Sequence, residues 1–155
     1  MHFENYLEIR QVNSIATIEN EIVNEFSLLD GDQEMTLYYL MELGQKLPAL
    51  PEAARKEENE VKGCQSKVWL TARAEGNKMI LEADSNTAIT KGLVSLLVRV
   101  FSGQAPDYVL AAELTFMKRI GLDRFIGTQR SNGFAAMIKQ IKFYALAFKT
   151  QLAGI

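Results

Sequence analysis

The segment from Ala88 to Phe101 is apolar around most of its circumference, and this narrows the possible folds more than any other feature of the chain. Leu93 and Leu97 recur at helical spacing on one side, while Val94 and Val98 cover much of the rest. A helix that is hydrophobic on most faces is usually buried, so other elements have to surround it. We therefore expect a domain built around this central helix.

Apolar residues also recur at helical spacing on both sides of this segment. The further helices predicted from this spacing cover residues 18–28, 33–46, a short stretch from Pro106, 114–120, and a final stretch from Ser131. In the second of them, Met35, Tyr39 and Leu43 are expected on the buried face. Asp30-Gly31-Asp32 precedes that helix as a turn and a source of N-cap side chains.

Residues 67–73 and 79–83 alternate apolar and polar side chains, which is typical of half-buried strands. Glu75-Gly76-Asn77 between them is a hairpin signal. The charge-rich stretch 52–62 is interpreted as a solvated loop or edge strand, with Val61 in a short first strand. Strands segregated from helices predict an α+β fold, with a small antiparallel sheet of about three strands and helices packed on one face.

The length of 155 residues suits one compact domain. We interpret residues 1–17 as an N-terminal extension and 18–155 as the domain. The formal net charge of −2 gives no long-range attraction for phosphate, so nucleic acid is not expected as a partner. The longest apolar run, 93–101, is too short and too polar to span a bilayer, and no secretory signal is visible. We predict a cytoplasmic protein without membrane contact.

The chain holds one cysteine, Cys64, and one histidine, His2. A single cysteine cannot form an internal disulfide or a multi-cysteine metal site, and it suits a reducing compartment. Lone cysteines are often buried and inert. Cys64, however, lies in a polar, glycine-containing loop before a strand, where a thiol can be reached. Lys62 and Lys67 would favour the thiolate if their ammonium groups came near the sulfur.

Few reactions suit such a thiol. Cysteine hydrolases need a histidine base, and His2 is at the chain terminus, so a hydrolase is not expected. A scaffold that builds iron–sulfur clusters normally needs several thiolate ligands. A one-cysteine peroxidase needs only a thiol of low pKa and stays open as an alternative. Sulfur exchange needs least: an accessible thiolate, a docking surface and shelter for the product persulfide.

Around Cys64 the sequence resembles the SufE family of sulfur-acceptor proteins, which includes the related CsdE. The resemblance runs from about residue 20 to residue 149, so the N-terminal segment falls outside it. Four blocks carry it in the family's order: "YLMELGQKLPALPE" (39–52), "NEVKGCQSKVWL" (59–70), "ADSNTAITKGLVSLL" (83–97) and "TQRSNGFAAMIKQIK" (128–142).

This resemblance implies a function. A pyridoxal-phosphate cysteine desulfurase of the SufS or CsdA type frees sulfur from L-cysteine as a persulfide. The SufE-like partner accepts that sulfur on the cysteine matching Cys64, stimulates the desulfurase, and relays the sulfur to an iron–sulfur scaffold. Pyridoxal phosphate belongs to the desulfurase, so no cofactor or metal is expected in this chain. The resemblance also implies an IscU-like fold and a sulfurtransferase-like accessory role, not that of a stand-alone hydrolase or metalloenzyme.

The resemblance extends to five further positions. Gly63, Gln65 and Ser66 match the signature loop and are expected to shape its tip or contact the partner. Alternatively, Gln65 and Ser66 only satisfy backbone groups of the loop. Asp84 matches a position beside the loop, with a cap for the following helix as the alternative. Arg130 matches the arginine before the last helix and is expected in a structural or docking role.

Three other functions stay open from the sequence. The protein could regulate a desulfurase without covalent chemistry, through the docking surface that any such pair needs. It could be a one-cysteine thiol redox protein acting on peroxides. It could also be a structural protein with an inert cysteine.

Overall fold

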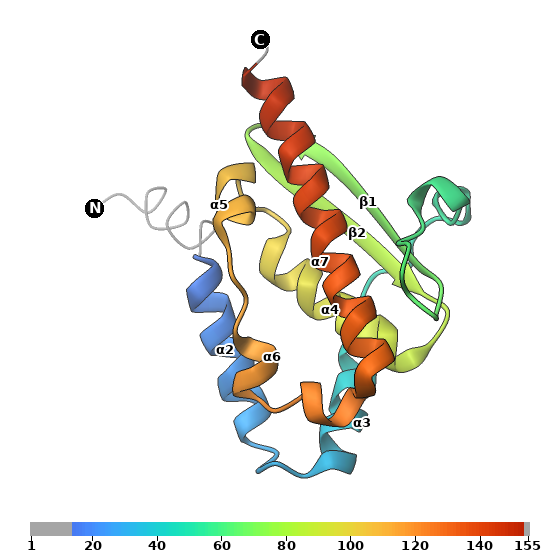
Figure 1. Cartoon of the computed structure of the whole chain (residues 1–155), viewed down its shortest axis with the longest axis vertical. Coiled ribbons are helices and arrows are strands. Elements are labelled where there is room, and N and C mark those ends of the chain that lie inside the picture. Colours follow the sequence, from blue (N-terminus) through green and yellow to red (C-terminus); the bar gives the residue numbers. More distant parts are fainter. Residues whose placement is uncertain (1–13, 154–155) are drawn as a thin grey trace.

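The computed structural model describes residues 14–153, which form helices packed against a β-hairpin (Figure 1). Its elements are α2 (Ile15–Ser27), α3 (Gln33–Gln45), the 3-10 turns η1 (Glu52–Ala54) and η2 (Glu57–Asn59), β1 (Val68–Glu75), β2 (Lys78–Ser85), α4 (Ala88–Phe101), α5 (Pro106–Ala111), α6 (Phe116–Arg119) and α7 (Asp123–Ala153). The bounds of α4 are those predicted. Most of the predicted extension 1–17, with His2, lies outside the described residues, so that boundary stays a prediction.

The hairpin pairs β1 with β2 in continuous antiparallel register, from Val68 opposite Ser85 to Glu75 opposite Lys78. Within residues 14–153 the sheet has two strands, so the expectation of about three was wrong. The missing strand is reduced to one bridge, in which the Val61 N–H donates to the Val68 carbonyl at 2.8 Å. Turn η2 ends just before this point, so the chain is not extended for long enough to form a strand.

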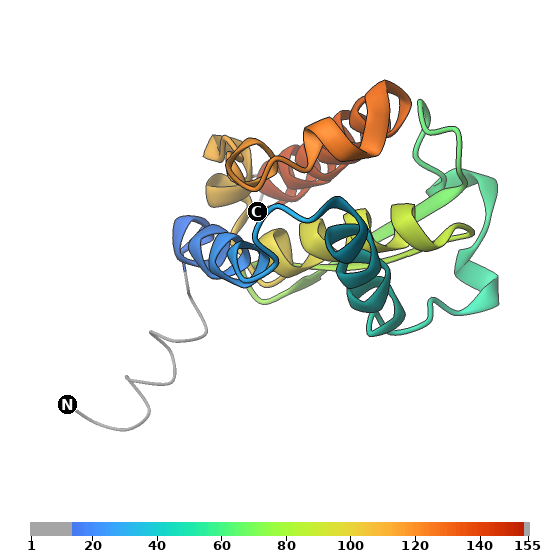
Figure 2. The same ribbon diagram turned by 90° about the horizontal axis from the view of Figure 1, so that it is seen from below.

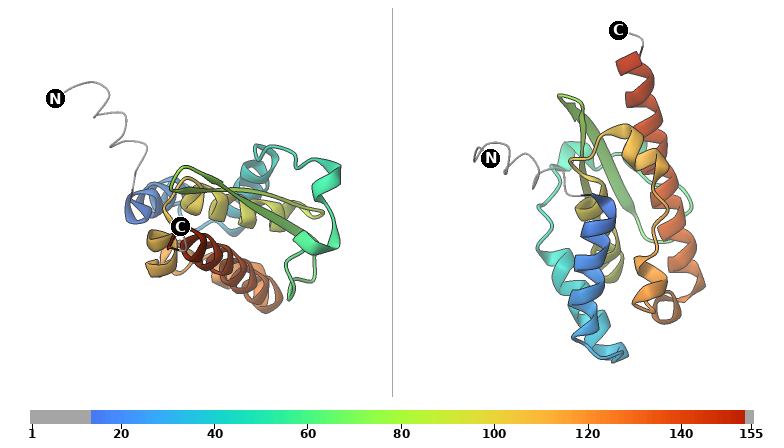
Figure 3. Two further views of the ribbon diagram at one scale, coloured as in Figure 1. Left: turned by 90° about the horizontal axis from the view of Figure 1, so that it is seen from above. Right: turned by 90° about the vertical axis from the view of Figure 1, so that its left-hand side faces the viewer.

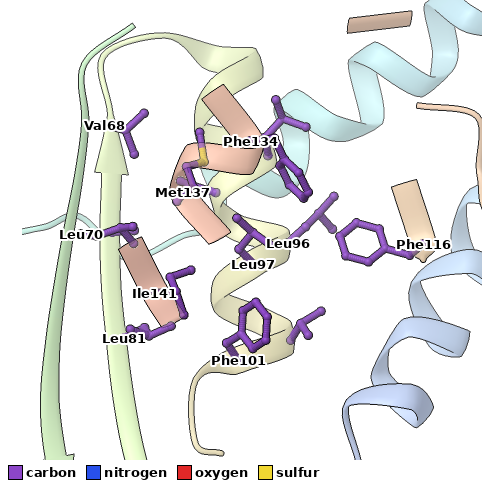
Figure 4. Close-up of a cluster of buried hydrophobic side chains, with 14 of the residues drawn as sticks. Val68, Leu70, Leu81, Leu96, Leu97, Phe101, Phe116, Phe134, Met137 and Ile141 are labelled. Atoms are coloured by element: carbon purple, nitrogen blue, oxygen red, sulfur yellow. The ribbon is translucent and has the colours of Figure 1, made fainter. Parts of the chain in front are cut away.

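One face of the hairpin carries the core, and helices α4 and α7 lie on that face, as predicted (Figures 2 and 3). Val68, Leu70 and Leu81 are at most 3% exposed. Figure 4 shows these side chains in one cluster with Leu97 of α4 and Ile141 of α7. Because strand side chains alternate, the opposite face holds Arg73, Glu75, Lys78 and Glu82, together with Trp69 and Ile80.

Helix α3 packs through a face rotated from the predicted one. Its buried residues are Thr36, Leu40 and Gly44, whereas Met35 is 52% exposed, so the prediction for Met35 was wrong. The predicted N-cap is confirmed, because the Asp32 carboxylate accepts from the Met35 N–H at 2.9 Å. Close backbone contact with α4 determines which side of α3 faces the core. A pattern of large apolar residues does not predict such a contact, because it depends on small residues.

This contact depends on two glycines. A Cβ added to Gly92 of α4 would lie 2.2 Å from the Leu40 carbonyl oxygen, and one added to Gly44 of α3 would lie 2.7 Å from the Gly92 nitrogen. Both obstacles are backbone atoms, which cannot rotate away as side chains do. The glycines therefore set the distance between α3 and α4.

A half-buried polar network joins the three helices α2, α3 and α4. Tyr39 donates to the Glu25 carboxylate at 2.6 Å, and the Arg99 guanidinium donates to the same carboxylate through two nitrogens. The hydrogen bond from Arg99 lowers the pKa of Glu25. Burial, together with the hydrogen bond to Glu25, raises the pKa of Tyr39 to about 12. The network thus keeps a carboxylate ionised and a phenol neutral between packed helices.

The two short helices are held by side chains from longer ones. Glu19 of α2 is buried and accepts from the backbone N–H groups of Thr115 (2.7 Å) and Phe116 (2.9 Å), which lie at the start of α6. Lys142 of α7 donates to the Ala112 carbonyl at 2.5 Å, just after α5. Helix ends carry backbone groups without intrahelical partners, so these contacts satisfy them. Within residues 14–153, no helix is long and apolar enough to cross a membrane.

Helix α7 begins earlier than the predicted Ser131, and a break divides it. Gly127 has φ 84° and ψ 166°, outside the helical region, so a short first segment is followed by the long terminal helix. A residue without Cβ adopts this conformation at little cost. The break brings the residues after Gly127 close to the loop that carries Cys64.

We predict that Gly92→Ala lowers the free energy of unfolding by about 3 kcal/mol or more, because a methyl group would be forced against backbone. Urea unfolding followed by circular dichroism measures this loss. Gln45→Ala, at an exposed position of α3, is the matched control and should stay within about 0.5 kcal/mol of the parent. Equal stability of Gly92→Ala and the parent would contradict the close packing of α3 on α4.

Candidate functional site

Cys64 lies in the loop between turn η2 and strand β1, beside the part of α7 that follows Gly127. A cavity of about 410 Å³ opens next to it. The cavity is lined from the Cys64 loop, α4 and α7 by Cys64, Gln65, Ser66, Thr90, Leu93, Ile126, Gly127, Thr128, Gln129, Arg130, Gly133 and Met137. Three segments that are distant in sequence therefore surround one thiol.

The Cys64 thiol is half-buried and rests against α7. Its Sγ–H donates to the Gly133 carbonyl with a sulfur–oxygen distance of 3.4 Å. Burial raises the pKa of Cys64 above its ordinary value, because removing the thiolate from water is unfavourable. In this conformation the thiol is neutral at physiological pH and a poor nucleophile.

The lysines of the loop pair with carboxylates, and burial is the cause of the shifted pKa of Cys64. Lys62 lies 3.9 Å from Glu57 and 3.8 Å from Glu60, and Lys67 lies 3.7 Å from Glu60. Their ammonium groups are thus drawn to carboxylates instead of to Cys64. The charge-rich stretch before the loop supplies these partners, which explains why neighbouring cations in the sequence do not lower the pKa of Cys64.

The end of the loop is tied to the start of α4. The Ser66 hydroxyl accepts from the hydroxyls of Thr87 (2.9 Å) and Thr90 (3.3 Å). One residue later, the Lys67 N–H donates to the Asn86 side chain at 3.0 Å. Ser66 therefore bonds to side chains of another element, not to the backbone of its own loop.

Gly63 and Gln65 flank the cysteine. Gly63 has φ 96°, and a Cβ there would lie 3.3 Å from that of Ala136 in α7, so both the backbone turn and the space favour glycine. Gln65 is exposed and lines the cavity. The loop tip is thus closely packed on one side of Cys64 and open on the other.

Arg130 reaches the same cavity from α7 and is exposed. Its guanidinium donates to the Ile126 carbonyl at 3.2 Å, across the helix break at Gly127. One side chain thereby stabilises the break and places a positive charge at the cavity. Among the described residues that line the cavity, it is the only charged one.

Asp84 lies apart from the cavity, in strand β2 opposite Trp69. Its side chain is 2% exposed and forms ion pairs with Arg55 and, at 3.3 Å, with Lys91. Burial raises the pKa of Asp84, but the Ser85 N–H and the two cations outweigh this effect, and its pKa lies below the ordinary value. The carboxylate therefore joins turn η1, the hairpin and α4.

The interpretation of Asp84 as a helix cap was wrong, because the N-cap position of α4 is Thr87. Asp84 instead connects Arg55, which follows turn η1, to Lys91 of α4. The Arg55 guanidinium also lies over the Trp69 ring, 5.7 Å from its centroid, which is within cation–π range.

Sequence reasoning missed Gly133, the residue in direct contact with the sulfur. A Cβ at Gly133 would lie 3.2 Å from the Cys64 Sγ. The available signal was a glycine inside a helical apolar stripe, which is unfavourable for a helix unless something must approach closely. Thr90, on the opposite wall, was also missed, because its place in the sequence is that of an ordinary helix residue.

Comparison with known families gives this geometry a context. The family model for SufE, described as an Fe-S metabolism associated domain, matches residues 20–145. The chain belongs to the SufE family. The match spans the hairpin, α4, the Cys64 loop and the part of α7 that lines the cavity, so the whole candidate site lies within the SufE domain.

Curated relatives agree with this assignment. A SufE-like protein of Rhizobium meliloti (strain 1021), named as uncharacterized, is 36% identical over 128 residues, covering 79% of this chain and 91% of the relative. Another uncharacterized SufE-like protein, from Rhizobium etli, is 37% identical over 128 residues, covering 79% of this chain and 86% of the relative.

A solved structure supports the fold. The solution structure of a hypothetical protein from Thermus thermophilus matches with a TM-score of 0.71 and 24% sequence identity, covering 86% of this chain and 96% of that one. The α+β architecture of the SufE domain is therefore shared with a structure determined experimentally.

We predict that Asp84→Asn lowers the free energy of unfolding at pH 7 by about 2–3 kcal/mol, since it leaves two cations without their buried carboxylate. The pKa of Asp84 is depressed on folding, so its contribution is full above the ordinary value of about 3.9 and is lost as pH falls through the lower folded pKa. Urea unfolding of both proteins at pH 7 and near pH 2 should show the gap closing in acid. A gap that persists there would contradict the ion-pair account.

We also predict that Lys62→Gln and Lys67→Gln leave the alkylation rate of Cys64 within about twofold of the parent, because neither ammonium group acts on the thiol. Intact-mass spectrometry after timed exposure to iodoacetamide measures this rate. A large decrease in either variant would show that the lysine promotes thiolate formation after all.

Proposed function

We propose that this SufE-family protein accepts persulfide sulfur from a cysteine desulfurase onto Cys64, stimulates the desulfurase by removing that sulfur, and delivers the sulfur for iron–sulfur cluster assembly. The observation that carries the proposal is the position of Cys64, on the signature loop of a SufE domain and at the edge of an open cavity. The family's association with Fe-S metabolism supports the destination of the sulfur.

The transfer is a thiol exchange. The Cys64 thiolate attacks the terminal sulfur of the donor persulfide, a new bond forms between the two sulfurs, and the donor's own sulfur–sulfur bond breaks. The donor cysteine leaves as a thiolate and can take up the proton that Cys64 loses. One sulfane sulfur moves, and no external oxidant or reductant is needed.

The lining of the cavity fits this chemistry. Within residues 14–153 the lining includes no aspartate, glutamate or histidine that could act as a general base, and the exchange requires none beyond the departing thiolate. A volume of about 410 Å³ leaves ample room beside Cys64 for one more sulfur atom. The product persulfide can therefore be sheltered where the thiol now rests.

The resting thiol argues against peroxide chemistry. A one-cysteine peroxidase needs a thiol of low pKa, whereas burial raises the pKa of Cys64. An inert structural cysteine is also disfavoured, because Cys64 borders an open cavity and is only half-buried. A conformational change on docking with the desulfurase would expose the sulfur to its donor.

The proposal places the remaining chemistry elsewhere. Pyridoxal phosphate is expected on a SufS- or CsdA-type desulfurase, and cluster assembly on a separate scaffold. A cytoplasmic location follows from the chemistry, since a reducing compartment keeps a lone thiol available.

We predict that the protein gains the mass of one sulfur atom when it is mixed with a cysteine desulfurase and L-cysteine, and that Cys64→Ser abolishes both this gain and the stimulation of the desulfurase. The serine variant lacks the nucleophile but keeps a side chain of similar size. Intact-mass spectrometry and the rate of alanine release measure the two effects.

Two outcomes separate the alternatives. If Cys64→Ser folds normally and still stimulates the desulfurase fully, the protein is a non-covalent regulator. If the parent forms sulfenic acid rapidly with peroxide and gains no sulfur from any desulfurase tested, it is a thiol redox protein.

A further inference from the structure

A second cavity, of about 360 Å³, lies between the start of α2 and the end of α5, which are close together in Figure 1. We call it the α2–α5 groove. Its walls are largely apolar and include Ile15, Ala16, Tyr108, Ala111 and Ala112. Because Ala16, Tyr108 and Ala111 are exposed, the groove is open to solvent. An open groove with such walls suits the apolar side chains of a peptide.

The α2–α5 groove is separate from the cavity beside Cys64. It includes Gln104, which follows α4 and whose carbonyl accepts from the Met79 N–H near the turn of the hairpin at 2.9 Å. The Cys64 loop enters the hairpin at its other end, at Val68, and its cavity reaches Thr90 in the first turn of α4. Among the described residues the two cavities share none of their lining. A ligand in the groove would therefore leave the thiol accessible.

The groove carries negative charge. Glu19 and Glu113 both line it, and the lining within residues 14–153 includes no lysine or arginine. Glu19 is buried and already accepts hydrogen bonds from the start of α6. Glu113 is exposed, and within residues 14–153 no cation pairs with it. The groove is thus complementary to an apolar peptide that carries a positive charge.

The N-terminal residues of the same chain have this chemistry. The sequence before Ser14 is MHFENYLEIRQVN, in which Leu7, Ile9 and Val12 are apolar and Arg10 is the charged residue nearest to Ser14. Ser14 itself lines the groove, so this sequence joins the domain at the rim. A peptide tethered by a few residues has an effective concentration on the order of 1 mM, so even a weak contact would be populated.

We propose that residues 1–13 bind in the α2–α5 groove of their own chain, with apolar side chains against α2 and α5 and with Arg10 paired to Glu113. The N-terminal extension then covers an apolar surface that the SufE domain would otherwise expose to water. This contact lies away from Cys64 and is independent of sulfur transfer.

Ala111→Lys tests this contact in the full-length protein, because it places a long side chain and a cation in the groove. Trypsin cleaves after Arg10, the one lysine or arginine of residues 1–13. Cleavage depends on the population in which the segment is free, so a bound segment is cut slowly. We expect the cut after Arg10 to be at least about fivefold faster in Ala111→Lys than in the parent. Intact-mass spectrometry after timed exposure to dilute trypsin measures the rate.

Ala135→Lys is the matched control. It changes another exposed helical alanine to lysine, on α7 and outside the groove, so its rate should stay within about twofold of the parent. Equal rates in folded Ala111→Lys and the parent would overturn the proposal. A cut in the parent that slows as protein concentration rises would also overturn it, because the segment would then occupy the groove of a second copy.

Disulfide trapping covers the case in which Ala111→Lys does not fold. In a Cys64→Ser background, Ile9→Cys combined with Ala111→Cys should form an intramolecular disulfide under mild oxidation, seen as the loss of two hydrogens. The control pairs Ile9→Cys with Thr17→Cys, an exposed position of α2 outside the groove.

The control has the shorter loop to close, so without binding it would cross-link faster. We expect the Ala111→Cys pair to react at least about fivefold faster than the Thr17→Cys pair. The reverse order, equal rates, or disulfide-linked dimers would overturn the proposal. Neither measurement uses a desulfurase, so failure of sulfur loading would count against the proposed function and leave this result standing.

Discussion

The burial of helix α4 is the constraint on which the rest of the structure depends. Its apolar surface is covered by the hairpin on one side and by α2, α3 and α7 on others. Because this helix is hydrophobic on most faces, none of these neighbours can leave without exposing apolar surface to water. The candidate site is attached to this packed core. Thr87 and Thr90 at the start of α4 donate hydrogen bonds to Ser66, and Gly133 of α7 accepts one from the Cys64 thiol.

Several charged residues near the site are paired with one another, while Arg130 is the charged residue that lines the cavity. The loop lysines form ion pairs with Glu57 and Glu60. The buried Asp84 forms ion pairs with Arg55 and Lys91. Cations that are close to Cys64 in sequence are thus occupied by carboxylates. The Gly133 carbonyl contacts the sulfur, and burial raises the pKa of the thiol.

The elements that sequence patterns predicted well are those with long, regular periodicity. The bounds of α4 and the hairpin around Gly76-Asn77 follow from apolar spacing and turn residues. The sequence failed where contact between backbones decides the outcome. Met35 was placed on the buried face of α3, but Gly44 turns another face toward α4. The third strand was expected from a single apolar residue, and turn η2 leaves too little extended chain to form it.

In the candidate site, too, some residues were predicted from the sequence and others are shown only by the fold. Cys64, Gln65, Ser66 and Arg130 were named from the sequence, and the fold brings all four to one cavity. Asp84 was named with them but lies elsewhere, because adjacency to a loop in sequence does not fix the face of the strand. Gly133 was not named, since the absence of a side chain leaves no chemical signature, and only the fold shows what fills the space.

The single thiol on a single loop has a consequence for how such a carrier works. Cys64 is the one cysteine of the chain, so a donor and a recipient of sulfur have to react with it in turn. Under the proposed function, the one thiol exchanges sulfur with a single partner at a time. The protein would have to separate from one partner before meeting the next, and the throughput of the relay would then be set by dissociation as much as by chemistry.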